Sequence, residues 1–152
     1  MAYATAEARQ ELLDAIAQAT DHIGAALAAL GAAYEQLDEQ SGDRLEDELF
    51  RPVQLAYGRA RRTHTGFAER HGLPTRAFEP VAPGHPSQGV KGFIDGAIES
   101  VAAADLELST LQDSMRPVEV GDPDLRAGLS EVRELLADLP SRSRRFVSLF
   151  GR

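Results

Sequence analysis

The chain contains no cysteine, so disulfide bonds, thiolate metal sites and cysteine nucleophiles are excluded. Lysine is nearly absent as well, since Lys91 is the only lysine among 16 basic residues. No apolar stretch approaches the length of a membrane span, and the N-terminal sequence lacks the basic start and apolar run of a signal peptide. These absences predict a cytoplasmic protein without membrane contact.

The length of 152 residues fits a single domain, residues 1–152. A chain of this size buries roughly 68–70% of its unfolded surface when it folds. Its core therefore needs no metal or disulfide for stability.

The clearest pattern in the chain is a run of apolar positions spaced alternately four and three residues apart. This spacing puts the side chains on one face of a helix, which can be buried only against other helices. It predicts a helix over residues 87–116, capped by Ser87 and ended by Arg116 and Pro117. The positions are Val90, Ile94, Ala97, Val101, Ala104, Leu108, Leu111 and Met115.

Similar spacing predicts a helix over residues 5–39, where isoleucine and leucine recur every seven residues. A parallel row of alanines either lets a neighbouring helix approach closely or reflects helix propensity alone. Those alanines are Ala19, Ala26 and Ala33.

A second helix is predicted over residues 44–71, after a break at residues 41–43 and with Asp43 and Glu46 as a capping box. Its apolar spacing begins four, four, three near Pro52, which predicts a kink there. Gly72 and the proline that follows end the helix.

Residues 72–86 carry four prolines and form the one long connection. A last helix is predicted over residues 123–150, capped by Asp122 and bent at Pro140. The fold is thus predicted to be all-α, an antiparallel four-helix bundle built from two helical hairpins and a Pro/Gly-rich linker. The path of the linker stays open, because about 15 residues at roughly 3.3 Å each can also cross the length of the bundle.

The arginines gather in two segments. Residues 51–76 hold six basic side chains against one acidic, and residues 141–152 hold four against none, although the net charge is −8. If the bundle runs up-down-up-down, both segments end at one pole, opposite the acidic residues 35–48 and 119–124. The basic pole would contain Arg59, Arg61, Arg62, Arg70, Arg142, Arg144 and Arg145.

Two interpretations of this pole are open. Cations near helix C-termini are favoured by the macrodipole and can pair with carboxylates of the first helix, so the pole can be purely structural. Alternatively, it binds an anionic ligand or an acidic protein. Nucleic acid is not expected as a partner, because the chain is acidic and has no surface aromatics interleaved with the arginines.

Metal and catalytic motifs are missing from the sequence. No histidine follows a glutamate at the Glu-x-x-His spacing of di-iron bundles. His22, His64 and His71 could cluster if the first two helices pair about residues 41–43, but His22 lies beside the apolar face, and we predict no metal or cofactor. No glycine-rich phosphate loop or nucleophile elbow is present either, so we do not expect an enzyme.

The predicted function is that of a non-catalytic interaction or scaffold protein. The alternative is a small-molecule or anion-binding protein whose site lies at the arginine pole near the linker. Self-association is also predicted, because the end of the chain carries apolar side chains on more than one helical face. Phe78 and Val81 are candidate contacts of such a homodimer, although the same residues can instead seal their own bundle. The apolar residues at the chain end are Phe146, Val147, Leu149 and Phe150.

Overall fold

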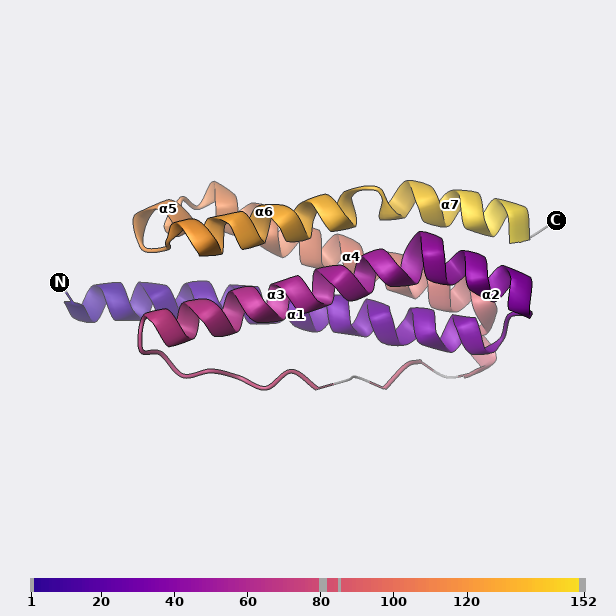
Figure 1. Ribbon diagram of the computed structural model, residues 1–152, viewed down its shortest axis with the longest axis horizontal. Coiled ribbons are helices and arrows are strands. Elements are labelled where there is room, and N and C mark those ends of the chain that lie inside the picture. Colours follow the sequence, from indigo (N-terminus) through magenta and orange to yellow (C-terminus); the bar gives the residue numbers. More distant parts are fainter. Residues whose placement is uncertain (1, 80–81, 85, 151–152) are drawn as a thin grey trace.

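The computed structural model describes residues 2–79, 82–84 and 86–150, and within these ranges the chain is helical with no strand, which confirms the all-α prediction. The long helices lie side by side along the longest dimension of the molecule (Figure 1). None of the described helices is long and apolar enough to cross a membrane. The α-helices are α1 (Ala2–Glu35), α2 (Glu39–Leu45), α3 (Arg51–Arg70), α4 (Gly89–Asp113), α5 (Arg116–Glu119), α6 (Pro123–Ala137) and α7 (Leu139–Phe150).

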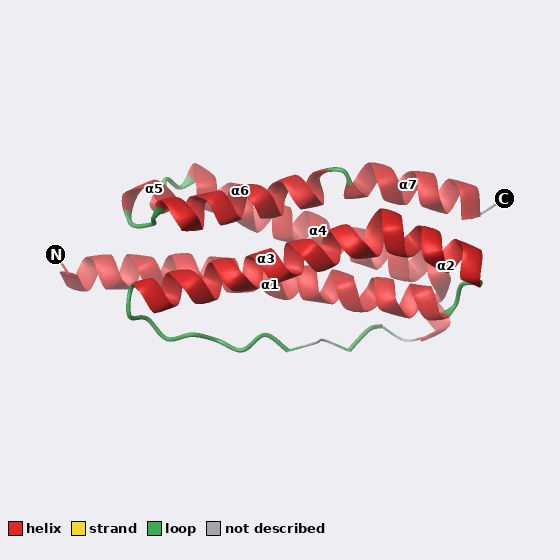
Figure 2. Cartoon of the chain, in the orientation of Figure 1, coloured by secondary structure: helices red, strands yellow, loops and turns green. Residues whose placement is uncertain are grey.

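The connection between α3 and α4 runs lengthwise along the outside of the helices, as the green trace in Figure 2 shows. As a result α4 begins at the end of the molecule opposite to where α3 finishes, and these two helices run in the same direction. The helices α1, α6 and α7 run the other way. The up-down-up-down order on which the charge prediction depended is therefore wrong.

The core lies mainly between α1 and its neighbours α4 and α3, with α6 packed on α3. The α4 pattern holds at every predicted position except Met115, which is half exposed. Helix α4 ends at Asp113, earlier than predicted, because Met115 adopts a left-handed φ of 65°, which is outside the helical region, and the Ser114 hydroxyl donates to the Leu111 carbonyl of the last turn. The alanine row of α1 is fully buried.

The break between the first two helices lies at residues 36–38 instead of 41–43. Asp38 caps α2, and its carboxylate accepts from the Ser41 N–H at 2.7 Å. Gly42 lies inside α2, where an added Cβ would come within 3.1 Å of the Tyr34 ring. This glycine permits close packing and does not end a helix, which is why the predicted boundary was wrong.

A single π turn, η1 (Glu46–Phe50), joins α2 to α3 just before Pro52. The Arg51 N–H reaches back five residues to the Glu46 carbonyl. Pro52 has no N–H to offer the Glu48 carbonyl, and Arg142 of α7 donates to that oxygen at 3.4 Å. The four-four-three spacing at Pro52 thus coincides with a π turn inside a continuous helical segment, residues 39–70.

Helix α4 begins at Gly89, and Ser87 lies in the 3-10 turn η2 (Pro86–Gln88), so Ser87 is not its N-cap. Asp122 caps α6 as predicted, and its carboxylate accepts from the Leu125 N–H at 2.8 Å. The last predicted helix is divided at Asp138 into α6 and α7, with Pro140 in the first turn of α7.

Candidate functional site

An open hollow of about 490 Å³ lies where the linker passes along α3. We call it the arginine groove. Its described lining includes no carboxylate, histidine or lysine. The lining residues are Gly58, Arg61, Arg62, Thr65, Gly66, Arg76, Ala77 and Phe78.

Two glycines of α3 shape the floor of the arginine groove. A Cβ added to Gly58 would lie 3.2 Å from Nη1 of Arg62, and one added to Gly66 would lie 2.9 Å from Nη1 of Arg70. Each arginine therefore folds back over the glycine one turn before it. Glycine inside a helix costs about 0.5–1 kcal/mol relative to alanine. The space it leaves lets the guanidinium group approach the helix backbone.

The linker supplies the opposite wall of the groove. Nη2 of Arg76 pairs with Oδ2 of Asp21 on α1 at 2.9 Å, and the guanidinium carbon lies 4.8 Å from the centre of the Phe78 ring. That ring meets the buried His64 ring edge-on at 5.2 Å. These contacts hold Arg76 and Phe78 beside α3.

The arginines of this region differ in how their charge is compensated. Arg51, Arg59 and Arg76 pair with Asp47, Glu131 and Asp21. Arg61 and Arg62 have no carboxylate partner among the described residues, and Arg61 only lies over the Tyr57 ring at 5.3 Å. Two uncompensated guanidinium groups thus face one hollow, and their planar donor pairs match phosphate and carboxylate groups.

His64 lies behind Phe78 with 3% of its surface exposed. Burial lowers the pKa of its imidazole, and Arg76 lowers it further against the opposing effect of Asp14 on α1. The ring is therefore neutral at pH 7, and its Nδ1 has no hydrogen-bond partner among the described residues.

The predicted alignment of His22 with His64 is wrong, because the turn lies about five residues earlier than expected. Asp14 acts on His64, and an added Cβ on Gly24 would touch Tyr57. In the described part of the chain, no group of three or more histidine, aspartate or glutamate side chains is placed to hold a metal ion.

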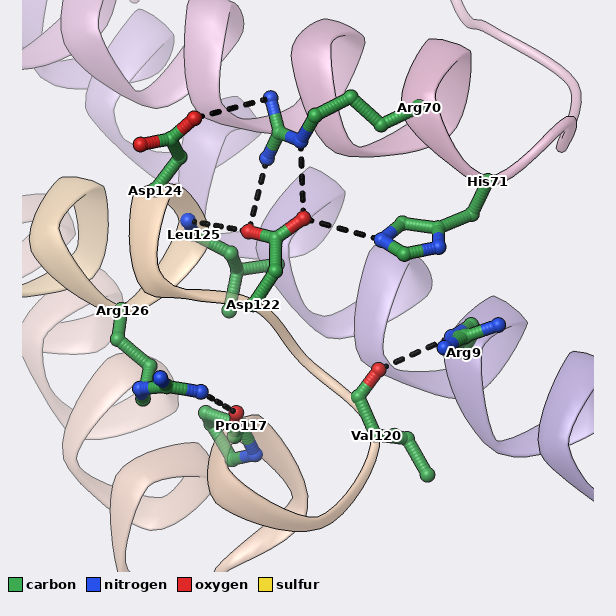
Figure 3. Close-up of polar contacts among 9 residues, drawn as sticks. All are labelled: Arg9, Arg70, His71, Pro117, Val120, Asp122, Asp124, Leu125 and Arg126. Carbon is green, nitrogen blue, oxygen red and sulfur yellow. Dashed lines mark hydrogen bonds and ion pairs between the residues drawn. The ribbon is translucent and has the colours of Figure 1, made fainter.

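A second polar centre joins the end of α3 to the start of α6 (Figure 3). The carboxylate of Asp122 accepts from Nε and Nη2 of Arg70 at 2.8 and 2.9 Å, and lies 3.0 Å from Nε2 of His71. Partial burial acts to raise the pKa of this carboxyl group. The hydrogen bonds from Arg70, the Leu125 N–H and His71 outweigh that effect and hold the pKa far below its ordinary value.

We call Arg70, His71 and Asp122 the Asp122 cluster. Arg9 of α1 donates to the Val120 carbonyl at 3.0 Å beside it, so the turn before α6 is held on two sides (Figure 3). Arg70 is paired with the carboxylates of Asp122 and Asp124, and these contacts stabilise the packing of α6 on α3. The sequence had placed Arg70 and residues 119–124 at opposite poles, which is wrong because the crossing linker brings α6 beside the end of α3.

The arginines of α7 lie at the other end of the molecule, where the chain finishes (Figure 1). Arg142 reaches the Glu48 carbonyl and Arg144 the Ser141 hydroxyl, while Arg145 is exposed. The structure therefore does not form the single pole of arginines. It brings together Arg61 and Arg62, and adds Arg76, which the sequence counted as basic but could not place.

The apolar residues at the chain end divide into two groups. Phe146 is buried and Val147 packs against the core, whereas Leu149 and Phe150 are 49% and 43% exposed. Phe78 contacts His64 within its own chain, and Val81 lies outside the described residues.

No protein-family model matches the chain, and comparisons with curated proteins and with solved structures found no match.

Proposed function

We propose that this protein is a non-catalytic four-helix bundle that binds an anion in the arginine groove. The observation that carries the proposal is that Arg61 and Arg62 lack carboxylate partners among the described residues and face the same hollow as Arg76. Unpaired cations that face one hollow attract anions from solution.

The size of the groove favours a small organic anion. Pockets of about 300–1,000 Å³ hold molecules of drug size, and the volume of about 490 Å³ lies in that range. An extended polyanion such as nucleic acid would be repelled by the acidic remainder of the chain. The ligand class that fits best is a phosphate- or carboxylate-bearing small molecule.

The test is a calorimetric titration with pyrophosphate at low and high salt. The paired substitution Arg61→Gln/Arg62→Gln should weaken binding at least tenfold, and salt should weaken binding to the unmodified chain. Arg144→Gln/Arg145→Gln is the matched control, since it removes two arginines at the other end of the molecule. Unchanged binding in the first variant, or equal loss in the control, would contradict the proposal.

Self-association through α7 is a second candidate function, favoured by the exposure of Leu149 and Phe150 on adjacent positions. Sedimentation analysis should find a dimer at high micromolar concentration. Leu149→Ser/Phe150→Ser should give a monomer with unchanged helix content. A full-length protein that is monomeric under these conditions rules out the dimer.

A further inference from the structure

A second depression lies between α1 and the segment formed by η1 and α3. It consists of two hollows of about 260 and 330 Å³ that share Gly31 and Phe50, and we call it the apolar slot. Its lining is apolar except at one end. The lining residues are Gly24, Leu27, Ala28, Gly31, Tyr34, Glu35, Glu46, Phe50 and Tyr57.

Two glycines on the same side of α1 form the floor of the apolar slot. A Cβ on Gly24 would lie 3.0 Å from the Tyr57 ring, so this glycine seats the tyrosine. A Cβ on Gly31 would meet nothing within 4 Å, so the space above it is open. The glycines are seven residues apart, which is about 10 Å along the helix axis. The slot therefore extends along α1.

The apolar slot and the arginine groove are lined by neighbouring residues of α3. The Tyr57 ring lines the slot, the Arg61 guanidinium lies over the same ring, and the next residue, Gly58, lines the groove. At the far end of the slot stand the carboxylates of Glu35 and Glu46. Positive charge at one end and negative charge at the other fix the direction of an anionic ligand.

We propose that slot and groove together bind a free single-chain anionic amphiphile, with its phosphate or carboxylate head at Arg61 and Arg62 and its hydrocarbon chain passing the Tyr57 ring to lie over Gly31. The position of the head rests on the proposed function, and the chain site is new. The slot lies along the helices, so the chain lies flat on the protein. An acidic protein is also repelled by anionic bilayers, which makes a dissolved amphiphile the occupant.

The size of the expected effect follows from hydrocarbon burial. Each methylene group that leaves water strengthens binding about fourfold. The slot is open on one side and covers only part of a chain. Octyl phosphate should therefore bind about 10- to 100-fold more tightly than methyl phosphate, which has the same head.

The experiment is an NMR titration of the isotope-labelled protein with methyl phosphate and octyl phosphate, both below micelle-forming concentrations. Methyl phosphate should shift the amide signal of Gly58, and octyl phosphate should shift those of Gly58 and Gly31. Gly31→Leu fills the open space and should weaken octyl phosphate at least tenfold while leaving methyl phosphate unchanged. Gly96→Leu on α4 is the matched control, because a Cβ there also meets nothing within 4 Å.

The two proposals fail in different ways. If octyl phosphate binds no more tightly than methyl phosphate, or binds equally well to Gly31→Leu, the amphiphile is overturned while phosphate binding by the groove stands. If neither phosphate ester binds, both proposals fail. Binding to anionic phospholipid vesicles without binding of octyl phosphate would assign the surface to a membrane and overturn the dissolved ligand.

Discussion

Arg62 and Arg70 lie two turns apart on α3, and each folds back over a glycine one turn before it, yet only Arg70 has carboxylate partners. Their local sequences are alike, so the difference comes from what the fold places opposite each one. Arg70 meets the Asp122 carboxylate at the start of α6, whereas Arg62 faces the hollow beside the linker. The comparison shows that the role of an arginine on this helix depends on its surroundings. Arg70 is paired with carboxylates and stabilises the fold, whereas the Arg62 guanidinium group has no such partner among the described residues.

The connection between α3 and α4 explains this difference. It carries the chain to the far end of the molecule before α4 begins, so the acidic turn before α6 returns to the end of α3 (Figure 1). The middle of α3 receives Arg76 from the linker instead, and Arg76 is already paired with Asp21 of α1.

The largest expected change in the free energy of unfolding concerns the Asp122 cluster, where Arg70 is paired. Asp122→Ala removes the cap of α6 and leaves Arg70 and His71 without their common partner. It should lower the free energy of unfolding by about 2–4 kcal/mol in urea denaturation. A loss below about half a kcal/mol would mean that the Asp122 cluster does not hold α6 to α3.

The next effect concerns the close approach of α6 to α3. A Cβ on Gly128 would lie 2.8 Å from Cγ2 of the buried Thr63 and would also strike its hydroxyl oxygen. Gly128→Ala should therefore cost about 1–3 kcal/mol. Gly96→Ala, where the added Cβ is unobstructed, should instead be neutral or stabilising by up to about 1 kcal/mol. Equal effects in the two variants would show that the helices do not pack this closely.

His64, beside the arginine groove, and Asp122, in the Asp122 cluster, should make stability depend on pH in different ranges. The folded pKa of His64 is lowered, so stability falls as the pH drops below the ordinary histidine pKa of about 6.5. The folded pKa of Asp122 is also lowered, so its contribution is lost only as the pH falls below about 3.9. Urea denaturation from pH 7 to 3 should show both losses. His64→Leu should remove the first alone, and Asp122→Ala should reduce the second.

The smallest expected change in the free energy of unfolding concerns Arg61 and Arg62, which have no carboxylate partner among the described residues. Arg61→Gln/Arg62→Gln should change the free energy of unfolding by less than about 0.5 kcal/mol, because no described carboxylate loses its partner. A loss above about 1 kcal/mol in thermal or urea unfolding would show that these arginines serve the fold as Arg70 does.

Many of the helices could be predicted from the spacing of apolar residues. A helix that buries one face needs apolar residues at intervals of three and four positions along that face. The buried positions of α4 and the Asp122 cap are examples. The helix break predicted at residues 41–43 was wrong because Gly42 packs against the Tyr34 ring, a contact that the local sequence pattern does not indicate.

The candidate site could be predicted only in part. Arg61 and Arg62 stand out by charge, but Arg76 joins them through contacts with Asp21 and Phe78, which depend on the path of the linker. The length of the linker allowed two paths, and only tertiary contacts choose between them. The apolar slot was not predicted, because it depends on two glycines of α1 lying opposite aromatic residues of another helix.

The connection from α3 to α4 has to carry the chain along the length of the molecule. Its 15 residues, 71–85, reach about 50 Å when fully extended, and the helical segment 39–70 beside which it runs is roughly 48 Å long. Its three prolines favour extended backbone, so an extended path costs little conformational entropy. Added residues would only loosen this connection, whereas removing two or three would pull Arg76 and Phe78 away from α3 or prevent the helices from aligning.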